Sequence, residues 1–146
     1  MKNKVNLFLC LTVIVIFLIA CKKDYYYYYK VEGKTLDKET KESVSGILVS
    51  FFKYDTISST KAKIQKYSPR EYEDWSDENG KFNASSSPCY PPYTPSTIYF
   101  YNTNGIYKDT IIRVDFSNVS LSGTPTKNYK GDYVLNIGDI ELEKIK

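Results

Sequence analysis

The side chains that could carry out chemistry in this chain of 146 residues are few. It contains three cysteines, Cys10, Cys21 and Cys89, and no histidine, so the commonest general base and the commonest metal ligand are both absent. A thiol without a histidine or a second cysteine beside it forms neither a nucleophile–base pair nor a zinc site. We therefore expect Cys89 to be a buried apolar residue, with an intermolecular disulfide as the alternative.

The segment before Cys21 has the pattern of a cleavable signal. Two lysines lie within Met1–Lys4, and the sixteen residues Val5–Ala20 that follow are apolar at all but two positions. This run is shorter than the roughly 20 residues that span a bilayer, but it is typical of the hydrophobic part of a signal peptide. Cys10 lies inside the run and leaves with it. An ordinary secretory signal and an uncleaved anchor are the alternatives.

The four residues Leu18-Ile19-Ala20-Cys21 resemble the lipobox of bacterial lipoproteins, in which a small residue precedes the cleaved bond and a cysteine follows it. The resemblance implies that the Cys21 thiol accepts a diacylglyceryl group and that cleavage makes Cys21 the N-terminus. Two or three acyl chains anchor a protein stably, at about 0.8 kcal/mol per buried CH₂. We expect a signal peptide over residues 1–20, a lipidated tether over residues 21–28 and a β-sandwich domain over residues 29–146.

The lipobox resemblance also implies a location and a set of partners. The partners are the membrane, reached through the lipid anchor, and the lipoprotein-processing and export machinery. Lys22-Lys23-Asp24 resembles the charged export tags of surface lipoproteins in Bacteroidetes-type bacteria. We expect a lipid-anchored protein of the bacterial cell envelope at the outer membrane, with the periplasmic and the surface face as alternatives.

The charge balance excludes one class of partner. The chain has 20 Lys and Arg against 17 Asp and Glu, a net charge of +3 that falls to +1 once Lys2 and Lys4 leave with the signal peptide. A chain so close to neutral is not a polybasic nucleic-acid binder. Its length permits one domain with a modest core.

Carboxylates are the remaining reactive groups. A glycosidase holds two of them at a defined separation in a cleft, and Ca²⁺ takes about six to eight oxygen ligands. The carboxylates here lie in charge-mixed turns and strand edges, which are usually solvated, so we expect no catalytic residue, no cofactor and no metal site. The groups considered are Glu71 with Glu73 or Asp74, Asp109 with Asp115, and the turn Asp77-Glu78-Asn79.

Apolar and polar residues alternate along much of the remaining chain, which is the pattern of half-buried strands. Gly-containing turn signals separate the alternating segments. About seven short strands without a helical period predict an all-β, immunoglobulin-like or transthyretin-like sandwich, with a small Greek-key barrel as the alternative. The expected strands include Tyr29–Thr35, Ile47–Tyr54, Lys61–Tyr67, Thr97–Tyr101, Ile106–Phe116 and Tyr133–Leu142, and the expected turns are Asp37–Glu42, Asp77–Gly80 and Asn102–Gly105.

Irregular segments interrupt this pattern. In the last strand the apolar phase shifts by one residue, and we expect Gly138-Asp139 to absorb the shift as a β-bulge. Ser85–Pro95, with four prolines, and Ser117–Lys130, rich in Ser, Thr and Gly, are expected to be loops.

Five consecutive tyrosines, Tyr25–Tyr29, follow the expected tether. Tyrosine partitions to the membrane–water boundary and is also a good strand former. Two interpretations of the run are therefore open: it forms a collar at the membrane interface, or it extends the first strand. We expect a mixture, with Tyr25–Tyr27 in the tether and Tyr28 and Tyr29 in the strand.

Three segments together resemble the carboxypeptidase-regulatory-like module: Tyr29–Asp37, Ser45–Val49 and Ser76–Phe82. Its pattern is a strand ending in V-x-G-x-T, a second strand opening at a glycine, and a D-x-x-G-x-F hairpin. The resemblance implies a transthyretin-like β-sandwich that is usually non-catalytic.

The layout of nearly the whole chain is similar to the radical-SAM-associated lipoproteins of Bacteroidetes-type bacteria. The similarity is carried by the lipobox, Tyr29–Gly33, Val114–Ser122, Tyr129–Tyr133 and Asp139–Leu142. It implies an anchored β-sandwich and a radical SAM peptide-modifying enzyme as a partner. We therefore expect a non-catalytic binding or structural module in the envelope.

Three aromatic residues, Trp75, Tyr90 and Tyr93, lie in or beside expected loops. Exposed aromatic faces stack on sugar rings and anchor protein interfaces, so a glycan-binding or adhesion module is the alternative function. The competing interpretation is that Trp75 fills the core and the tyrosines cover one end of it.

Two short segments, Asp55-Thr56-Ile57 and Asp109-Thr110-Ile111, resemble O-glycosylation acceptors of Bacteroidetes-type bacteria. Thr56 and Thr110 would be the modified residues, and a chance match is the alternative.

Overall fold

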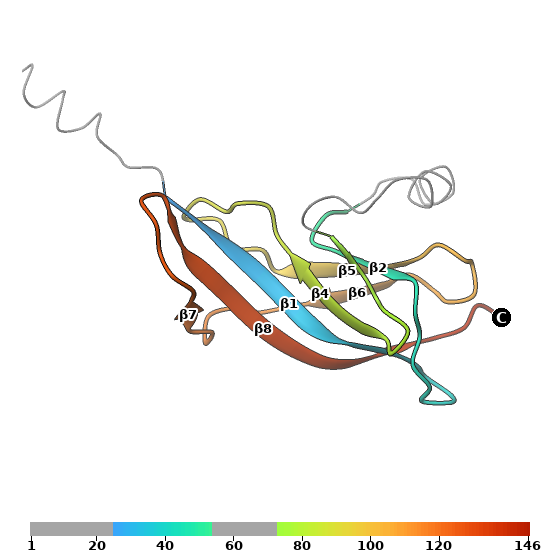
Figure 1. The fold of residues 1–146 in the computed structure, drawn as a ribbon. Coiled ribbons are helices and arrows are strands. Elements are labelled where there is room, and N and C mark those ends of the chain that lie inside the picture. The colour runs from blue at the N-terminus through green and yellow to red at the C-terminus, as the bar shows by residue number, and fades with distance from the viewer. Residues whose placement is uncertain (1–24, 54–72) are drawn as a thin grey trace, which may run out of the picture.

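The protein is a β-sandwich of two four-stranded sheets (Figure 1). The structure is a computed structural model that describes residues 25–53 and 73–146. The first sheet has the order β4-β1-β8-β7 and the second the order β3-β2-β5-β6. The strands are β1 (Tyr26–Asp37), β2 (Ile47–Ser50), β3 (Asp74–Trp75), β4 (Lys81–Ser85), β5 (Thr97–Asn102), β6 (Thr110–Arg113), β7 (Leu121–Ser122) and β8 (Tyr129–Leu142).

The predicted all-β sandwich is thus confirmed, with eight strands in the described ranges. The signal peptide, Cys21, Thr56, Glu71 and the predicted strand Lys61–Tyr67 lie outside those ranges. Among the described residues there is no helix with the length and hydrophobicity needed to cross a bilayer.

Strands β1 and β8, from the two ends of the sequence, run parallel at the centre of the first sheet. The predicted alternation in β1 is confirmed, because Val31 and Thr35 are fully buried while Lys30 and Glu32 are partly exposed. Residues of β1 pair with β8 over nearly their whole lengths, as Figure 1 shows. The sandwich is therefore closed by a contact between the first and the last described strand.

The predicted bulge in β8 is confirmed, one residue earlier than expected. Glu32 pairs with Asn136 and Gly33 with Gly138, so Ile137 is the extra residue. The bulge keeps the apolar side chains on one face: Ile140 and Leu142 are buried beyond it. A bulge opposes two residues to one and so restores the phase of the strand.

The predicted boundary between tether and strand is wrong. β1 begins at Tyr26, and not at Tyr28 or Tyr29. The backbone N–H of Tyr26 donates to the carbonyl of Asn128, and Tyr27 forms a bridge with Cys89. These partners are distant in sequence, so the tyrosine run alone could not reveal them. Tyr26 and Tyr27, which the tyrosine pattern assigns to the tether, are therefore part of the sheet.

Other boundaries differ for local reasons. β2 ends at Ser50, four residues before Tyr54, because the Ser50 hydroxyl accepts the backbone N–H of Phe52 and turns the chain. β6 spans only Thr110–Arg113 of the longer strand that was expected. The predicted loop Ser117–Lys130 contains the short strand β7 and, at its end, the start of β8.

The predicted turn Asp77–Gly80 is confirmed and joins the two sheets. One oxygen of the Asp77 carboxylate accepts the backbone N–H groups of Asn79 and Lys81. Gly80 has φ +75°, a conformation that favours glycine. Because β3 pairs in the second sheet and β4 in the first, this turn carries the chain from one layer to the other.

The core lies between the sheets. Phe82 from β4 and Phe100 from β5 meet edge to face, with ring centroids 5.4 Å apart, a favoured aromatic geometry. Cys89 is 4% exposed, as predicted for an apolar thiol, and its burial raises the pKa of the thiol. The largest fully buried side chains are Phe100, Ile47, Leu48, Ile98, Leu142, Val31 and Val49.

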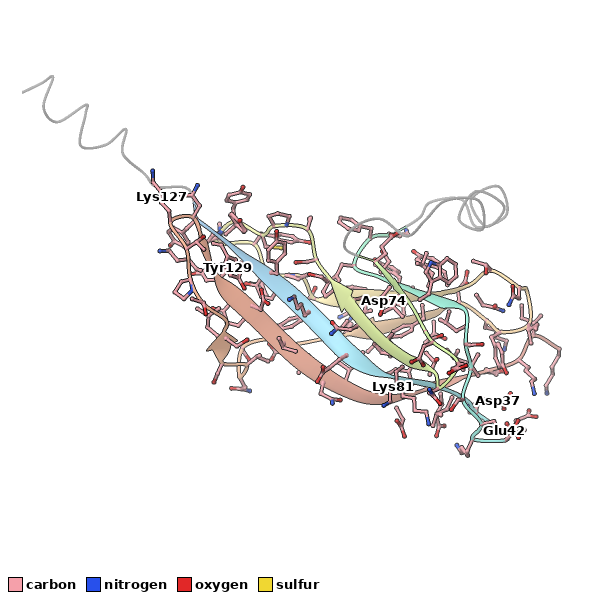
Figure 2. All side chains as sticks on the ribbon, in the orientation of Figure 1. Asp37, Glu42, Asp74, Lys81, Lys127 and Tyr129 are labelled. Carbon is pink, nitrogen blue, oxygen red and sulfur yellow. The ribbon has the colours of Figure 1, made fainter. Side chains whose placement is uncertain are left out.

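One buried carboxylate ties the end of β1 to the end of the described chain. Asp37 accepts hydrogen bonds from the Lys144 ammonium at 2.8 Å and the Tyr107 hydroxyl at 2.9 Å. Its other oxygen accepts the backbone N–H groups of Glu39 and Thr40. These donors, Lys144 first, hold the pKa of Asp37 well below its usual range. Figure 2 shows Asp37 at the end of the sandwich opposite Tyr129.

Close packing around Gly33 explains why the V-x-G-x-T segment has a glycine at this position. A Cβ atom at this position would lie 2.5 Å from the carbonyl oxygen of Gly138 and 2.9 Å from the Phe82 ring. We predict that Gly33→Ala lowers the free energy of unfolding by about 1–3 kcal/mol, because a packed backbone cannot move aside. Urea denaturation measures this. Glu32→Ala, on the opposite face, is the control and should stay within about 0.5 kcal/mol; equal losses would contradict the steric account.

Asp37 should make the protein sensitive to acid. Its pKa is lower in the folded state than the value of about 3.9 in an unfolded chain, so its stabilisation is present above about pH 4 and is lost as the pH falls further. We predict that Asp37→Asn unfolds more easily than wild type at pH 7 and that the difference shrinks below about pH 4. Urea titrations from pH 7 to pH 2.5 measure it. Asp139→Asn, an exposed carboxyl of β8, is the control, and a difference independent of pH would contradict the prediction.

Candidate ligand-binding groove

A groove of about 660 Å³ lies on the outer face of β4, β1 and β8. Pairing of Glu32 with Asn83 on one side and Asn136 on the other brings polar side chains of three strands into one row. Trp75 of β3 lies in the same lining. The remaining lining residues are Gly33, Lys34, Asp74, Asp77, Lys81, Phe82, Gly138 and Asp139.

Asp74 helps to position the tryptophan. Its carboxylate accepts the backbone N–H groups of Trp75 and Asn83, which ties β3 to β4 across the turn between the two sheets. On its other side, Trp75 pairs with Leu48 of β2. The indole is half-buried, so it is neither the core residue nor the fully exposed loop residue that the sequence left open.

The charges of the groove are mixed. Glu32, Lys34 and Lys81 form no ion pair within the described part of the chain, and Asp139 is exposed beside them. Asn136 accepts the backbone N–H of Gly138 through its side-chain oxygen, which leaves its amide N–H₂ for other partners. Donors and acceptors of both kinds around one indole suit a polar, uncharged ligand better than an ion of either sign.

The three aromatic residues named from the sequence do not line one site. Trp75 lines the groove. Tyr90 is 52% exposed and packs on Tyr26, with ring centroids 6.0 Å apart. Tyr93 is 63% exposed and lines a second hollow of about 190 Å³ together with Tyr99. Of these three residues, Trp75 is therefore the one that lines the groove, while Tyr90 belongs to a different cluster.

The carboxylates considered for acid–base chemistry hold turns and strand ends together. Asp109 accepts the backbone N–H of Asn102 at 3.0 Å. Asp115 accepts both the backbone N–H and the hydroxyl of Ser117, which lowers the pKa of its carboxyl. Glu73 accepts the Ser50 hydroxyl. In the described residues, moreover, no cluster of three or more His, Cys, Asp or Glu side chains could hold a metal ion, the Asp77 turn included.

Thr110 is the one O-glycosylation candidate inside the described ranges. It begins β6, the outer strand of the second sheet, and its side chain is partly exposed. Its hydroxyl makes a long hydrogen bond of 3.4 Å to the carbonyl of Lys108. A transferase could reach an edge position of this kind.

Sequence reasoning missed most of the groove. Glu32, Asn83 and Asn136 come from three distant segments, and only strand pairing makes them neighbours. The available signal was the outward phase of each strand, which marks these residues as solvent-facing. It does not say which outward faces lie together.

No protein-family model matches this chain, and no curated protein matches it. Among solved structures, the chain is similar to the T6 backbone pilin of serotype M6 Streptococcus pyogenes, described as a modular three-domain structure, with 14% identity and a TM-score of 0.37. The match covers 82% of this chain and 35% of the pilin chain, so the chain spans about a third of that protein's length. The fold described above rests on its own strand pairing.

Proposed function

We propose that this protein is an envelope-anchored lipoprotein whose β-sandwich is a non-catalytic binding module. The observation that carries the binding role is the groove on the outer face of the first sheet, with Trp75 beside amide, carboxylate and ammonium groups. The lipobox Leu18–Cys21 supports the anchor. The outer membrane is the proposed location.

A glycan is the ligand class that the groove suits best. Sugar rings stack on aromatic faces and offer many hydroxyls that both donate and accept hydrogen bonds. The half-buried indole of Trp75 has Asn83 and Asn136 in the same lining, and the charged side chains around them are of both signs. This second candidate keeps the earlier glycan hypothesis but assigns it to Trp75 without Tyr90 and Tyr93.

A radical SAM peptide-modifying enzyme remains the proposed protein partner. Its support is the sequence resemblance across the lipobox, Tyr29–Gly33 and the C-terminal segments. The structure adds that Tyr29–Gly33 and Asp139–Leu142 lie in the paired strands β1 and β8. The segments that carry the resemblance thus include the centre of one sheet.

The proposed lipid anchor on Cys21 can be tested by mass spectrometry. We predict that the protein purified from its native membrane begins at Cys21 and carries two or three acyl chains there, as shown by intact mass and peptide mapping. Cys21→Ser is the control and should retain the signal peptide without acyl groups. An unacylated wild-type protein would contradict the lipoprotein proposal.

The same spectra test Thr56 and Thr110, where we expect hexose-containing adducts and where an unmodified mass would end the glycosylation hypothesis.

The groove can be tested on an array of bacterial and plant polysaccharides. We predict that the wild-type protein binds at least one glycan and that Trp75→Ala weakens this binding about thirtyfold or more, because truncating a central aromatic anchor typically costs about 2 kcal/mol or more. Calorimetry with the bound glycan measures the change.

Tyr93→Ala is the matched control for the groove, since it removes an exposed aromatic residue that lines a different hollow. Its affinity should stay near that of wild type. Binding that survives Trp75→Ala, or that falls equally in both variants, would contradict the assignment. Circular dichroism confirms that each variant remains folded.

A further inference from the structure

The five-tyrosine run divides between two faces of β1. Tyr27 and Tyr29 face the core, where Tyr29 is 7% exposed and Tyr27 packs against the cluster. Tyr26 and Tyr28 therefore face outward, since successive side chains of a strand point to opposite sides. Their rings pack edge to face with centroids 5.6 Å apart.

Two tyrosines from other segments join this outer pair. Tyr129 of β8 lies 5.9 Å from Tyr26 and 5.8 Å from Tyr28, ring centroid to ring centroid. Tyr90 from the β4–β5 loop reaches Tyr26 at 6.0 Å. We call these four residues, Tyr26, Tyr28, Tyr90 and Tyr129, the tyrosine patch. It is assembled from three distant parts of the chain, so it is a product of the fold.

The charge around the tyrosine patch is positive. Its nearby acid, Asp132, is paired with Lys30 at 2.6 Å and accepts the Tyr129 hydroxyl at 2.6 Å. Burial and this hydrogen bond raise the pKa of Tyr129 to about 12, so the phenol stays neutral. Lys127 and Lys130 lie beside Tyr129 in sequence, and neither forms an ion pair with any described residue. Figure 2 shows Lys127 and Tyr129 together at one end of the sandwich.

The tyrosine patch is also close to the proposed anchor. β1 begins at Tyr26, only five residues after Cys21, and five residues of extended chain reach at most about 18 Å. A lipid-anchored protein therefore holds this end of the sandwich near the bilayer surface. Tyrosine rings with a lysine beside them that pairs with no described acid match the chemistry of that surface, where tyrosines sit at the headgroup level and anionic lipids attract cations.

We propose that the tyrosine patch rests on the lipid bilayer, with Lys127 at anionic headgroups. This inference rests on the proposed lipidation of Cys21. It makes the patch a second contact that orients the domain. The groove begins about 13 Å further along β1, four residues from Tyr28 to Glu32, and so lies away from the contact. The anchored sandwich then presents the groove while its β1 start touches the membrane.

The test uses the full lipidated protein in vesicles of phosphatidylcholine and phosphatidylglycerol. An environment-sensitive fluorophore is attached at Tyr90→Cys, and in a separate protein at Glu42→Cys at the opposite end (Figure 2). Cys89 is buried and Cys21 is the lipidated residue, so the introduced thiol is the accessible one. We expect nitroxide lipids to quench the label at position 90 strongly and the label at position 42 weakly. Equal, weak quenching at both positions would overturn the inference.

Flotation of the vesicles separates failure of this inference from failure of the anchor. A protein that does not float contradicts the lipoprotein proposal. A protein that floats with its label at position 90 in water overturns only the proposed contact between the tyrosine patch and the bilayer. The label could instead become shielded from water without vesicles, to an extent that rises with protein concentration. That result would assign the patch to contact with a second copy of the chain and would also overturn the inference.

Charge reversal tests the lysines. Lys127→Glu should reduce the quenching at position 90 in vesicles with phosphatidylglycerol and leave it unchanged in pure phosphatidylcholine. Lys38→Glu, an exposed lysine beyond the far end of β1, is the matched control and should have no effect. Equal effects of the two substitutions would overturn the contact with headgroups.

Discussion

The parallel pairing of β1 with β8 is the constraint on which the other features depend. A parallel pair cannot be closed by a tight turn, and here the chain between β1 and β8 forms the whole second sheet together with β4 and β7 of the first. The pairing places Val31 opposite Leu135 and Thr35 opposite Ile140, and Val31 and Ile140 are both part of the hydrophobic core. It also requires the close approach at Gly33, where the Gly138 carbonyl occupies the space that a side chain would take. Without this pairing the first sheet would divide into two pairs of strands, β4 with β1 and β7 with β8.

The same pairing creates both surfaces of interest. At one end of the two strands, Tyr26 and Tyr28 meet Tyr129 on the outer face. Toward the other end, Glu32 lies beside Asn136 in the groove. One sheet face thus carries an aromatic region at the start of β1, near the proposed lipid anchor, and a polar region farther along the strand. This division suits a module that is held at a membrane and presents a binding surface.

Much of the fold followed from local patterns. Alternation in β1, the phase shift in β8 and the Asp77–Gly80 turn each depend on neighbours in sequence, and each is found in the structure. The errors came where a distant partner decides. Tyr26 is in the strand because Asn128 accepts its N–H, and no property of the tyrosine run indicates this.

The amino-acid sequence alone determined that the chain forms strands, that Cys89 is buried, and that histidine chemistry is absent, because these depend on residue types and on a period of two. Tertiary structure decided which outward faces meet. It separated Trp75 from Tyr90, and it assembled the tyrosine patch from three segments. The physical reason is that the register between strands is set by packing and hydrogen bonding across the whole sheet, so a surface made by several strands exists only once they are paired.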